Sequence, residues 1–259
     1  MTAPDITPHE RLVPPLGGFN VTALGLEVRR MLRNRRTLMF IVVFPSLFFF
    51  LFGLSTRGPR APGPEIVAFI MINMAVYGAM VGTTAGGAAV AVERSLGWSR
   101  QLRLTPLRPA AYVVMKVLTA MVLGFVAVAT VFIVGALNGV HVEPHVWVLS
   151  FLAAWLCSLV FAAFGLFVGF LLPSENVMQF VGPLLAILAM FGGLFIPLSA
   201  LPPVMQTIAK FTPVYGVGQL ARAPLVGGFT SVALFNVAAW TFLFAIGAML
   251  LFRRDTARV

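Results

Sequence analysis

His141, Glu143 and His145 lie close together in the sequence, and transition metals accept imidazole and carboxylate groups as ligands. All three stand in a short connection around Pro144 between two apolar stretches, so they would bind a metal only weakly. A solvated turn is the interpretation we favour. The single Cys157 lies within an apolar stretch, so there is no cysteine cluster, and we expect no metal site.

Catalysis within a membrane requires a Ser/His pair, a pair of acids or a metal cluster. His9 lies in the N-terminal tail, and His141 and His145 lie in the connection around Pro144, outside the expected spans, which also hold no acidic pair. We therefore expect no catalytic residues, and an intramembrane enzyme is the alternative from a different class. The phosphate-binding pattern Gly-x-x-x-x-Gly-Lys-Ser/Thr is absent too, because neither lysine, Lys116 or Lys210, follows a glycine.

The elements that would position any functional group are long apolar helices. Of the 259 residues, 59% are hydrophobic and 10% are charged, whereas soluble domains carry roughly 25% charged residues. Six uncharged windows each reach the roughly 20 residues that cross ~30 Å of hydrocarbon. They cover residues 37–56, 66–92, 117–142, 144–174, 176–209 and 223–252. Because barrel strands alternate apolar and polar residues and these windows do not, the sequence predicts an all-α integral membrane protein with six transmembrane helices.

The predicted parts are a flexible tail at 1–18, an amphipathic interfacial helix at 19–36, a single six-span transmembrane domain at 37–252 and a cytoplasmic tail at 253–259. The tail lacks the pattern of a signal peptide, so we expect the first span to stay in the mature protein. Within 19–36, apolar residues recur at helical spacing and arginines take the other faces. They are Val21, Leu24, Val28, Met31 and Leu32, against Arg29, Arg30, Arg33 and Arg36. A cytoplasmic extension of the first span is the alternative.

In a soluble domain, a net charge of +10 would suggest that the protein binds nucleic acid. Here the basic residues are distributed as the topology of a membrane protein requires, so we expect no nucleic-acid partner. With the N-terminus inside, thirteen arginines fall in cytoplasmic segments and four basic residues fall outside. The inner set is Arg11, Arg29, Arg30, Arg33, Arg35, Arg36, Arg94, Arg100, Arg103, Arg108, Arg253, Arg254 and Arg258, and the outer set is Arg57, Arg60, Lys210 and Arg222. This bias predicts that both termini are cytoplasmic.

The spans themselves carry packing signals and little charge. Gly78, Gly82 and Gly86 share one helical face, which favours close helix packing over the alternative of a substrate path. No Asp or Glu lies between the ends of the spans, so the intramembrane carboxylate of proton- or sodium-coupled carriers is missing. Lys116 stands near the inner start of the third span, and we interpret it as an anchor whose ammonium group reaches the interface.

Two connecting segments are unusual. Residues 93–108 are basic and amphipathic, and Thr105 followed by Pro106 is a cap and first-turn pair that would restart a helix. A helix offered to a cytoplasmic partner and an ordinary positive-inside loop remain two open interpretations. Residues 195–222 are too apolar for a solvated loop, yet four prolines break them into pieces too short to span. We expect short re-entrant or interfacial helices there.

The pattern Glu93-Arg94, Gly97, Leu102 and Thr105-Pro106, followed by the segment at 195–202, a Thr-Pro pair and a last span, resembles the ABC type 2 exporter permeases. The most similar members are the daunorubicin-resistance-type drug exporter permeases. The resemblance implies that a segment after the second span couples to an ATPase. It also implies that a broken hydrophobic hairpin between spans five and six closes the outer side of the substrate path. Its residues here are Glu93, Arg94, Gly97, Leu102, Thr105 and Pro106 for coupling, and Pro197, Leu201, Pro202 and Pro213 for the outer gate.

The same resemblance implies a permease subunit that exports an amphipathic drug or lipid-like molecule from a bacterium across its inner membrane. ATP and Mg²⁺ would be bound by a separate cytoplasmic ATPase, and this chain would hold no cofactor. A second permease copy, identical or paralogous, would complete the assembly within the lipid bilayer. Export of a lipid-linked polysaccharide is the alternative cargo.

Overall fold

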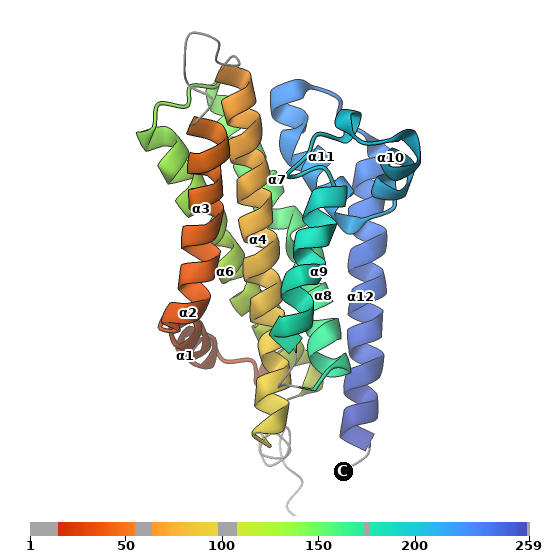
Figure 1. Ribbon diagram of the computed structural model, residues 1–259. Helices are drawn as coiled ribbons and strands as arrows, with labels where there is room; N and C mark the ends of the chain where they lie inside the picture. The colour runs from red at the N-terminus through yellow and green to blue at the C-terminus, as the bar shows by residue number, and fades with distance from the viewer. Residues whose placement is uncertain (1–14, 55–63, 98–107, 174–176, 258–259) are drawn as a thin grey trace, which may run out of the picture.

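The computed structural model describes residues 15–54, 64–97, 108–173 and 177–257, and all regular secondary structure in them is helical. The long helices run side by side along one axis (Figure 1). Helix α1, Val21–Leu32, and the C-terminal end of α12, Ser231–Ala257, lie at one end of the bundle, which we call the base. Helices α10, Pro203–Lys210, and α11, Pro213–Val226, lie at the opposite end.

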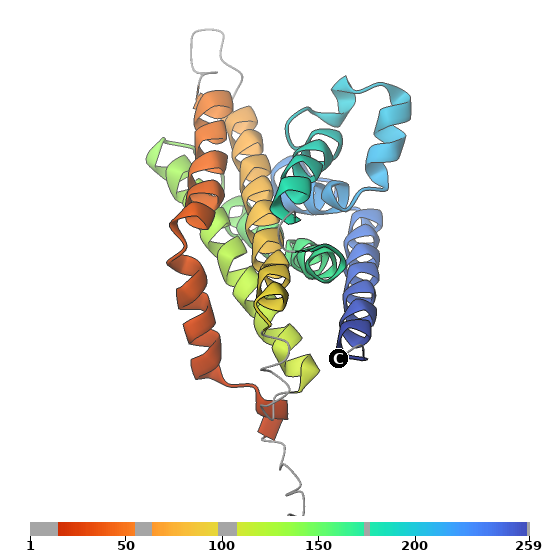
Figure 2. The same ribbon diagram turned by 60° about the horizontal axis from the view of Figure 1, so that its bottom comes forward.

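Helix α1 lies crosswise to the long helices. It is seen nearly end-on in Figure 1 and along its length in Figure 2. Its N-cap is Asn20, whose side chain accepts a hydrogen bond from the Thr22 N–H (2.7 Å), and it buries Met31. The predicted helix at 19–36 is therefore divided, because α1 ends at Leu32 and Asn34 caps the next helix. Just before α1, Pro15–Gly18 forms the short helix η1, whose Gly17 carbonyl accepts a hydrogen bond from the Arg108 N–H (2.8 Å).

The first long apolar run is not a regular α-helix. It comprises α2 (Arg35–Leu38), η2 (Met39–Val43), α3 (Phe44–Phe49) and η3 (Phe50–Leu54), and both η2 and η3 are π-helical. Pro45 lacks an N–H and its ring crowds the carbonyl four residues earlier, so the wider turn of η2 accommodates it. Phe40, Phe44 and Phe52 point outward, whereas Phe48 packs on Tyr77 and Phe195.

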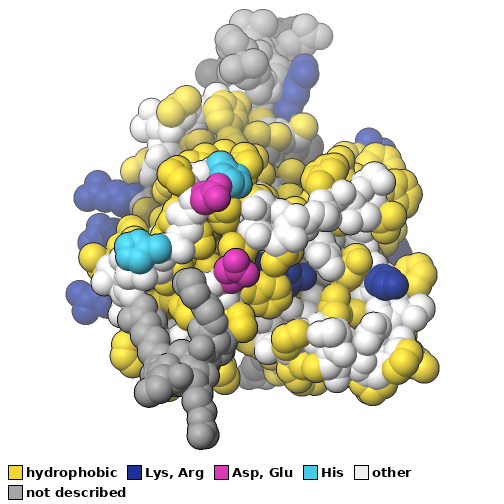
Figure 3. Space-filling view, turned by 90° about the horizontal axis from the view of Figure 1, so that it is seen from above, with side chains coloured by type: hydrophobic (Ala, Val, Ile, Leu, Met, Phe, Trp, Pro, Cys, Tyr) yellow, Lys and Arg dark blue, Asp and Glu magenta, His cyan; other side chains and the backbone are white. Residues whose placement is uncertain are grey.

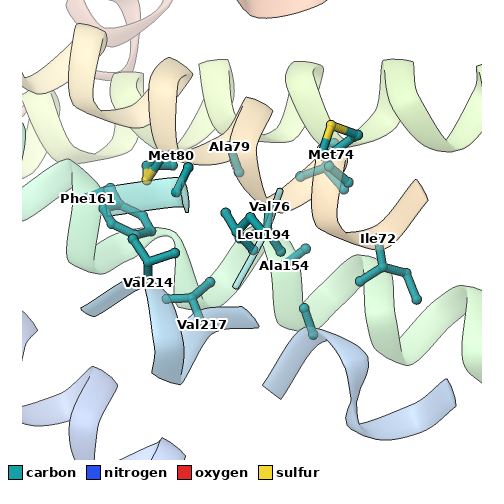
Figure 4. Packing of buried hydrophobic residues seen from close by; sticks show 14 of the residues in the cluster. Ile72, Met74, Val76, Ala79, Met80, Ala154, Phe161, Leu194, Val214 and Val217 are labelled. Atoms are coloured by element: carbon teal, nitrogen blue, oxygen red, sulfur yellow. The ribbon is translucent and has the colours of Figure 1, made fainter. Parts of the chain in front are cut away.

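Helix α4, Pro64–Ser95, is the centre of the bundle and packs on α6, Pro109–Leu137, and on α8, Leu159–Leu171. Helix α7, Pro144–Cys157, continues into α8 through Ser158. In Figure 4, Met80 of α4, Phe161 of α8 and Val214 of α11 meet in the core. The described residues hold five apolar segments long enough to cross a membrane, namely 35–53, 65–95, 110–137, 144–171 and 231–254.

The fifth predicted span differs from the structure. Residues 176–209 hold α9, Val177–Phe191, a glycine turn, η4, Leu198–Ala200, and most of α10. At 15 residues α9 is about 22 Å long, less than the ~30 Å of hydrocarbon. Gly193 has φ +83°, a conformation that ends the helix and that other residues rarely adopt. The described residues thus hold five long apolar segments and one short one where the sequence predicts six spans.

Other predicted boundaries also shift. The third apolar helix begins at Pro109 rather than at residue 117, because Lys116, which served as the boundary, is buried inside the helix bundle. The last one begins at Ser231 rather than at 223, since residues 223–226 complete α11. Helix α12 also continues beyond residue 252 to Ala257.

The glycines of α4 and α8 bring backbones into contact. A Cβ on Gly86 would lie 2.7 Å from Ala120 Cα of α6, and one on Gly82 would lie 3.3 Å from the Leu123 carbonyl oxygen. A Cβ on Gly78 would lie 3.0 Å from Pro45 Cγ. On the other side of α4, a Cβ on Gly165 would lie 2.3 Å from the Thr84 carbonyl oxygen. Larger side chains at these positions would force the helices apart.

We expect Gly165→Ala to lower the free energy of unfolding by about 1–3 kcal/mol, because the added methyl group meets the backbone of α4. Gly182→Ala in α9 is the matched control, since a Cβ there meets nothing within 4 Å and alanine favours the helix. Thermal unfolding of the detergent-solubilised variants measures the difference. Equal midpoints for the two variants would contradict the close packing of α4 on α8.

Candidate functional site

Four charged side chains and one tyrosine meet at the base of the bundle. Glu27 and Arg30 come from α1, Glu93 from α4, and Tyr112 and Lys116 from α6. The Lys116 ammonium donates to Glu27 Oε1 (2.6 Å) and Glu93 Oε1 (2.5 Å). Arg30 Nη2 also contacts both carboxylates, and Tyr112 Oη donates to Glu93 Oε2 (2.6 Å). We call these five residues the base cluster.

The base cluster is electrically neutral and largely buried. Lys116 is 4% and Glu93 5% exposed, so each has given up hydration that only its partners replace. For Arg30, burial acts to lower the pKa, but the hydrogen bond to Glu93 and the charges of Glu27 and Glu93 outweigh it and raise the pKa. The cluster therefore joins the crosswise helix α1 to two long helices through fixed charges.

The interpretation of Lys116 as an interfacial anchor is wrong. Its ammonium group points into the bundle towards two carboxylates rather than out to an interface. Sequence reasoning also missed Glu27, Arg30 and Tyr112. Glu27 could have been singled out because it is the one acidic residue among the arginines of α1. A single sequence does not show, however, that it pairs with a lysine 89 residues away.

The described part of the predicted coupling segment is the end of α4. Glu93 faces the base cluster, and Arg94 Nη1 donates to the carbonyl oxygens of Gly169 (3.2 Å) and Phe170 (2.9 Å) in α8. The Gly97 N–H donates to the Arg94 carbonyl oxygen (3.0 Å), and Gly97 has φ +74°, a conformation that does not continue the helix. Leu102, Thr105 and Pro106 lie outside the described residues. Adjacent residues thus fix the end of α4 to α1, α6 and α8.

The predicted gate residues lie at the end opposite the base. Pro197 precedes η4, Leu201 and Pro202 lie between η4 and α10, and Pro213 is the buried first residue of α11. Thr212 caps α11 by accepting a hydrogen bond from the Tyr215 N–H (3.3 Å). We call η4, α10 and α11 the hairpin. Figure 3 shows this end of the molecule, where hydrophobic and uncharged side chains predominate.

Arg222 of α11 is buried without an acidic partner among the residues that contact it. It is 3% exposed, although the sequence places it in an outer connection. Its Nη1 donates to Asn73 Oδ1 of α4 (2.8 Å) and to the Gly193 carbonyl oxygen (3.1 Å), and its guanidinium lies 5.2 Å from the centre of the Phe69 ring. All three partners are uncharged. Arg222 therefore ties the hairpin to α4 and to the turn after α9.

The His/Glu grouping between α6 and α7 forms one exposed contact, between His145 Nδ1 and Glu143 Oε2 (3.0 Å). Across the parts of the chain that the structure describes, no three His, Cys, Asp or Glu side chains come together as a metal site.

A helical bundle with five long apolar segments, a crosswise basic helix and a broken hairpin defines a multi-pass membrane protein. Residues 21–226 match the family model described as ABC-2 type transporter, and the chain belongs to this family. It is also 28% identical over 206 residues to the Bacillus subtilis (strain 168) protein named "Putative transport permease YvfS". The alignment covers 78% of this chain and 83% of the relative. The chain is thus a non-catalytic permease subunit of a family whose permeases pair with separate ABC ATPases.

Proposed function

We propose that this permease exports an amphipathic drug or lipid-like molecule, using ATP that a separate subunit hydrolyses with Mg²⁺. The observation that carries the proposal is that Glu93 and Arg94, the first residues of the segment that resembles an ATPase-docking loop, fix the end of α4 to the bundle. The apolar spans support such a cargo, since a site for it is built mainly from apolar and aromatic side chains.

Coupling would pass from the docking segment into the bundle. Glu93, Arg94, Gly97, Leu102, Thr105 and Pro106 form this segment in our proposal. Because Glu93 holds α1 and α6 and Arg94 holds α8, a push on the segment would move four helices together rather than bend α4 alone. Glu93 serves as a positioning residue, since its carboxylate faces the bundle.

At the other end, Pro197, Leu201, Pro202 and Pro213 would shape the outer gate. The contacts of Arg222 with Asn73 and Gly193 support this role, because they hold the hairpin against the bundle. Opening would require these hydrogen bonds to break.

A second permease copy, identical or paralogous, would complete the transporter in the bacterial inner membrane. The outward apolar faces of the first long run and of α9 favour contact with another apolar surface, and Phe44 and Ile187 are examples. Both termini would be cytoplasmic. The location of α1 and the C-terminal end of α12 at the base supports their lying on the same side of the membrane (Figure 1), and the excess of arginine there favours the cytoplasmic side.

Gly97→Pro is expected to reduce recovery of the cognate ATPase with the tagged permease by about tenfold, a loss of about 1.4 kcal/mol in binding free energy. Proline cannot adopt the positive φ and removes the hydrogen bond to Arg94. Gly139→Pro is the matched control at the opposite end, where φ is +72° and the N–H donates to Ala136 at the same 3.0 Å. Equal recovery with both variants would argue against docking at this segment.

A further inference from the structure

Helices α1 and α2 carry arginines that no acidic side chain of the described residues neutralises. Arg30 is paired in the base cluster. Arg29, Arg33, Arg35 and Arg36 are exposed, and no carboxylate within the described residues forms an ion pair with any of them. Four neighbouring positive charges that no described carboxylate pairs with raise the affinity of this surface for anions.

Two of these arginines line a hollow of about 460 Å³, together with Arg30 and Leu26. The four residues follow the spacing i, i+3, i+4 and i+7, so they share one face of α1. Leu26 is 63% exposed and supplies an apolar surface beside the guanidinium groups. A group with a phosphate and an attached apolar part matches this lining, because arginine forms paired hydrogen bonds with phosphate oxygens.

The position of the hollow identifies the source of the phosphate. Helix α1 lies crosswise to the bundle, and the exposed apolar surface of the first long run begins seven residues after it, at Met39 (61% exposed) and Phe40 (59% exposed). A helix in this arrangement lies where lipid headgroups meet the acyl chains. We propose that the hollow on α1 binds the phosphate headgroup of an anionic phospholipid.

Such a lipid would act on the base cluster as well as on α1. Arg30 lines the hollow and contacts Glu27 and Glu93 through Nη2, so the lipid and the cluster share one guanidinium group. Lipid binding would hold α1 in place, and we expect anionic lipid to raise the thermal stability of the protein.

The test compares two double variants of the full chain, purified in a neutral detergent. Arg29→Gln/Arg33→Gln removes two charges from the hollow, and Arg35→Gln/Arg36→Gln removes two exposed charges outside it. Native mass spectrometry and thermal unfolding are measured with phosphatidylglycerol or phosphatidylcholine added. We expect wild type and the second variant to retain phosphatidylglycerol and its stabilising effect, and the first variant to bind it about tenfold more weakly.

Several outcomes would overturn the proposal. Equal weakening in both double variants would mean a general attraction of the basic surface, and equal retention of the two lipids by wild type would mean no headgroup preference. Stabilisation by soluble glycerol phosphate equal to that by phosphatidylglycerol would identify a free anion as the ligand. Unchanged binding of phosphatidylglycerol by the first variant would mean that the lipid does not bind in the hollow.

Discussion

Replacing Lys116 with methionine is expected to lower the free energy of unfolding by about 3–5 kcal/mol. The substitution keeps most of the side-chain volume but removes the ammonium group that neutralises Glu27 and Glu93. Arg30 alone would then face two carboxylates, one of them 5% exposed. An uncompensated buried charge costs far more than the pair contributes, so this loss should be among the largest for a single exchange in the chain.

Lys210→Met is the control for Lys116→Met, because it removes the other lysine of the chain from an exposed position in α10. Adding Glu93→Gln to Lys116→Met should restore part of the stability, since it removes the charge that lost its partner. Denaturant unfolding in detergent measures all four proteins. If Lys116→Met and Lys210→Met behaved alike, the base cluster would not hold α1 on the bundle.

Asn73→Asp is expected to slow export by about tenfold or more while raising the unfolding midpoint. The exchange places a carboxylate where Asn73 Oδ1 now accepts from Arg222 (2.8 Å). The buried guanidinium thereby gains an opposite charge, and unit charges ~4 Å apart attract each other by about 4 kcal/mol at an effective dielectric constant of ~20. Because about 1.4 kcal/mol changes a two-state population tenfold, the closed hairpin would be favoured by at least that factor.

Asn73→Leu should lower stability instead. It removes one of the two hydrogen-bond acceptors of Arg222 and leaves the Gly193 carbonyl as the other. Arg222→Gln combined with Asn73→Asp should cancel the gain in midpoint. Efflux of a fluorescent amphipathic dye and thermal unfolding are the two readouts. Destabilisation by Asn73→Asp as large as that by Asn73→Leu would refute the role of Arg222 as a tie between hairpin and bundle.

The sequence predicts the fold class and the second and fourth apolar segments well, because uninterrupted apolar runs have few alternatives to long helices. Helix α4 extends only two residues beyond the predicted 66–92 at its start and three at its end. The prediction fails where a charge is taken as a boundary, as at Lys116, since a single sequence does not show that an acid elsewhere neutralises it. It also fails at α9, because the predicted span at 176–209 is apolar throughout and its composition does not show the glycine turn that ends the helix.

The candidate site is harder to predict because its contacts join distant parts of the chain. Lys116 and Glu27 are separated by 89 residues, and Arg222 and Asn73 by 149. The resemblance assigns Glu93 and Arg94 to the coupling segment, but it gives no sign of the contacts that both side chains make with the bundle. The roles of Leu102, Thr105 and Pro106 remain predictions.

The most direct test of the account is to find which end of the permease contacts the ATPase. A photo-crosslinking amino acid is placed at Leu96, which is 76% exposed at the end of α4, or at Leu137, which is 81% exposed at the end of α6 on the opposite side. Both variants are co-expressed with the cognate ATPase in membranes and irradiated. The expected result is an adduct with the ATPase from position 96 and none from position 137. An adduct from position 137, or from neither position, would contradict it.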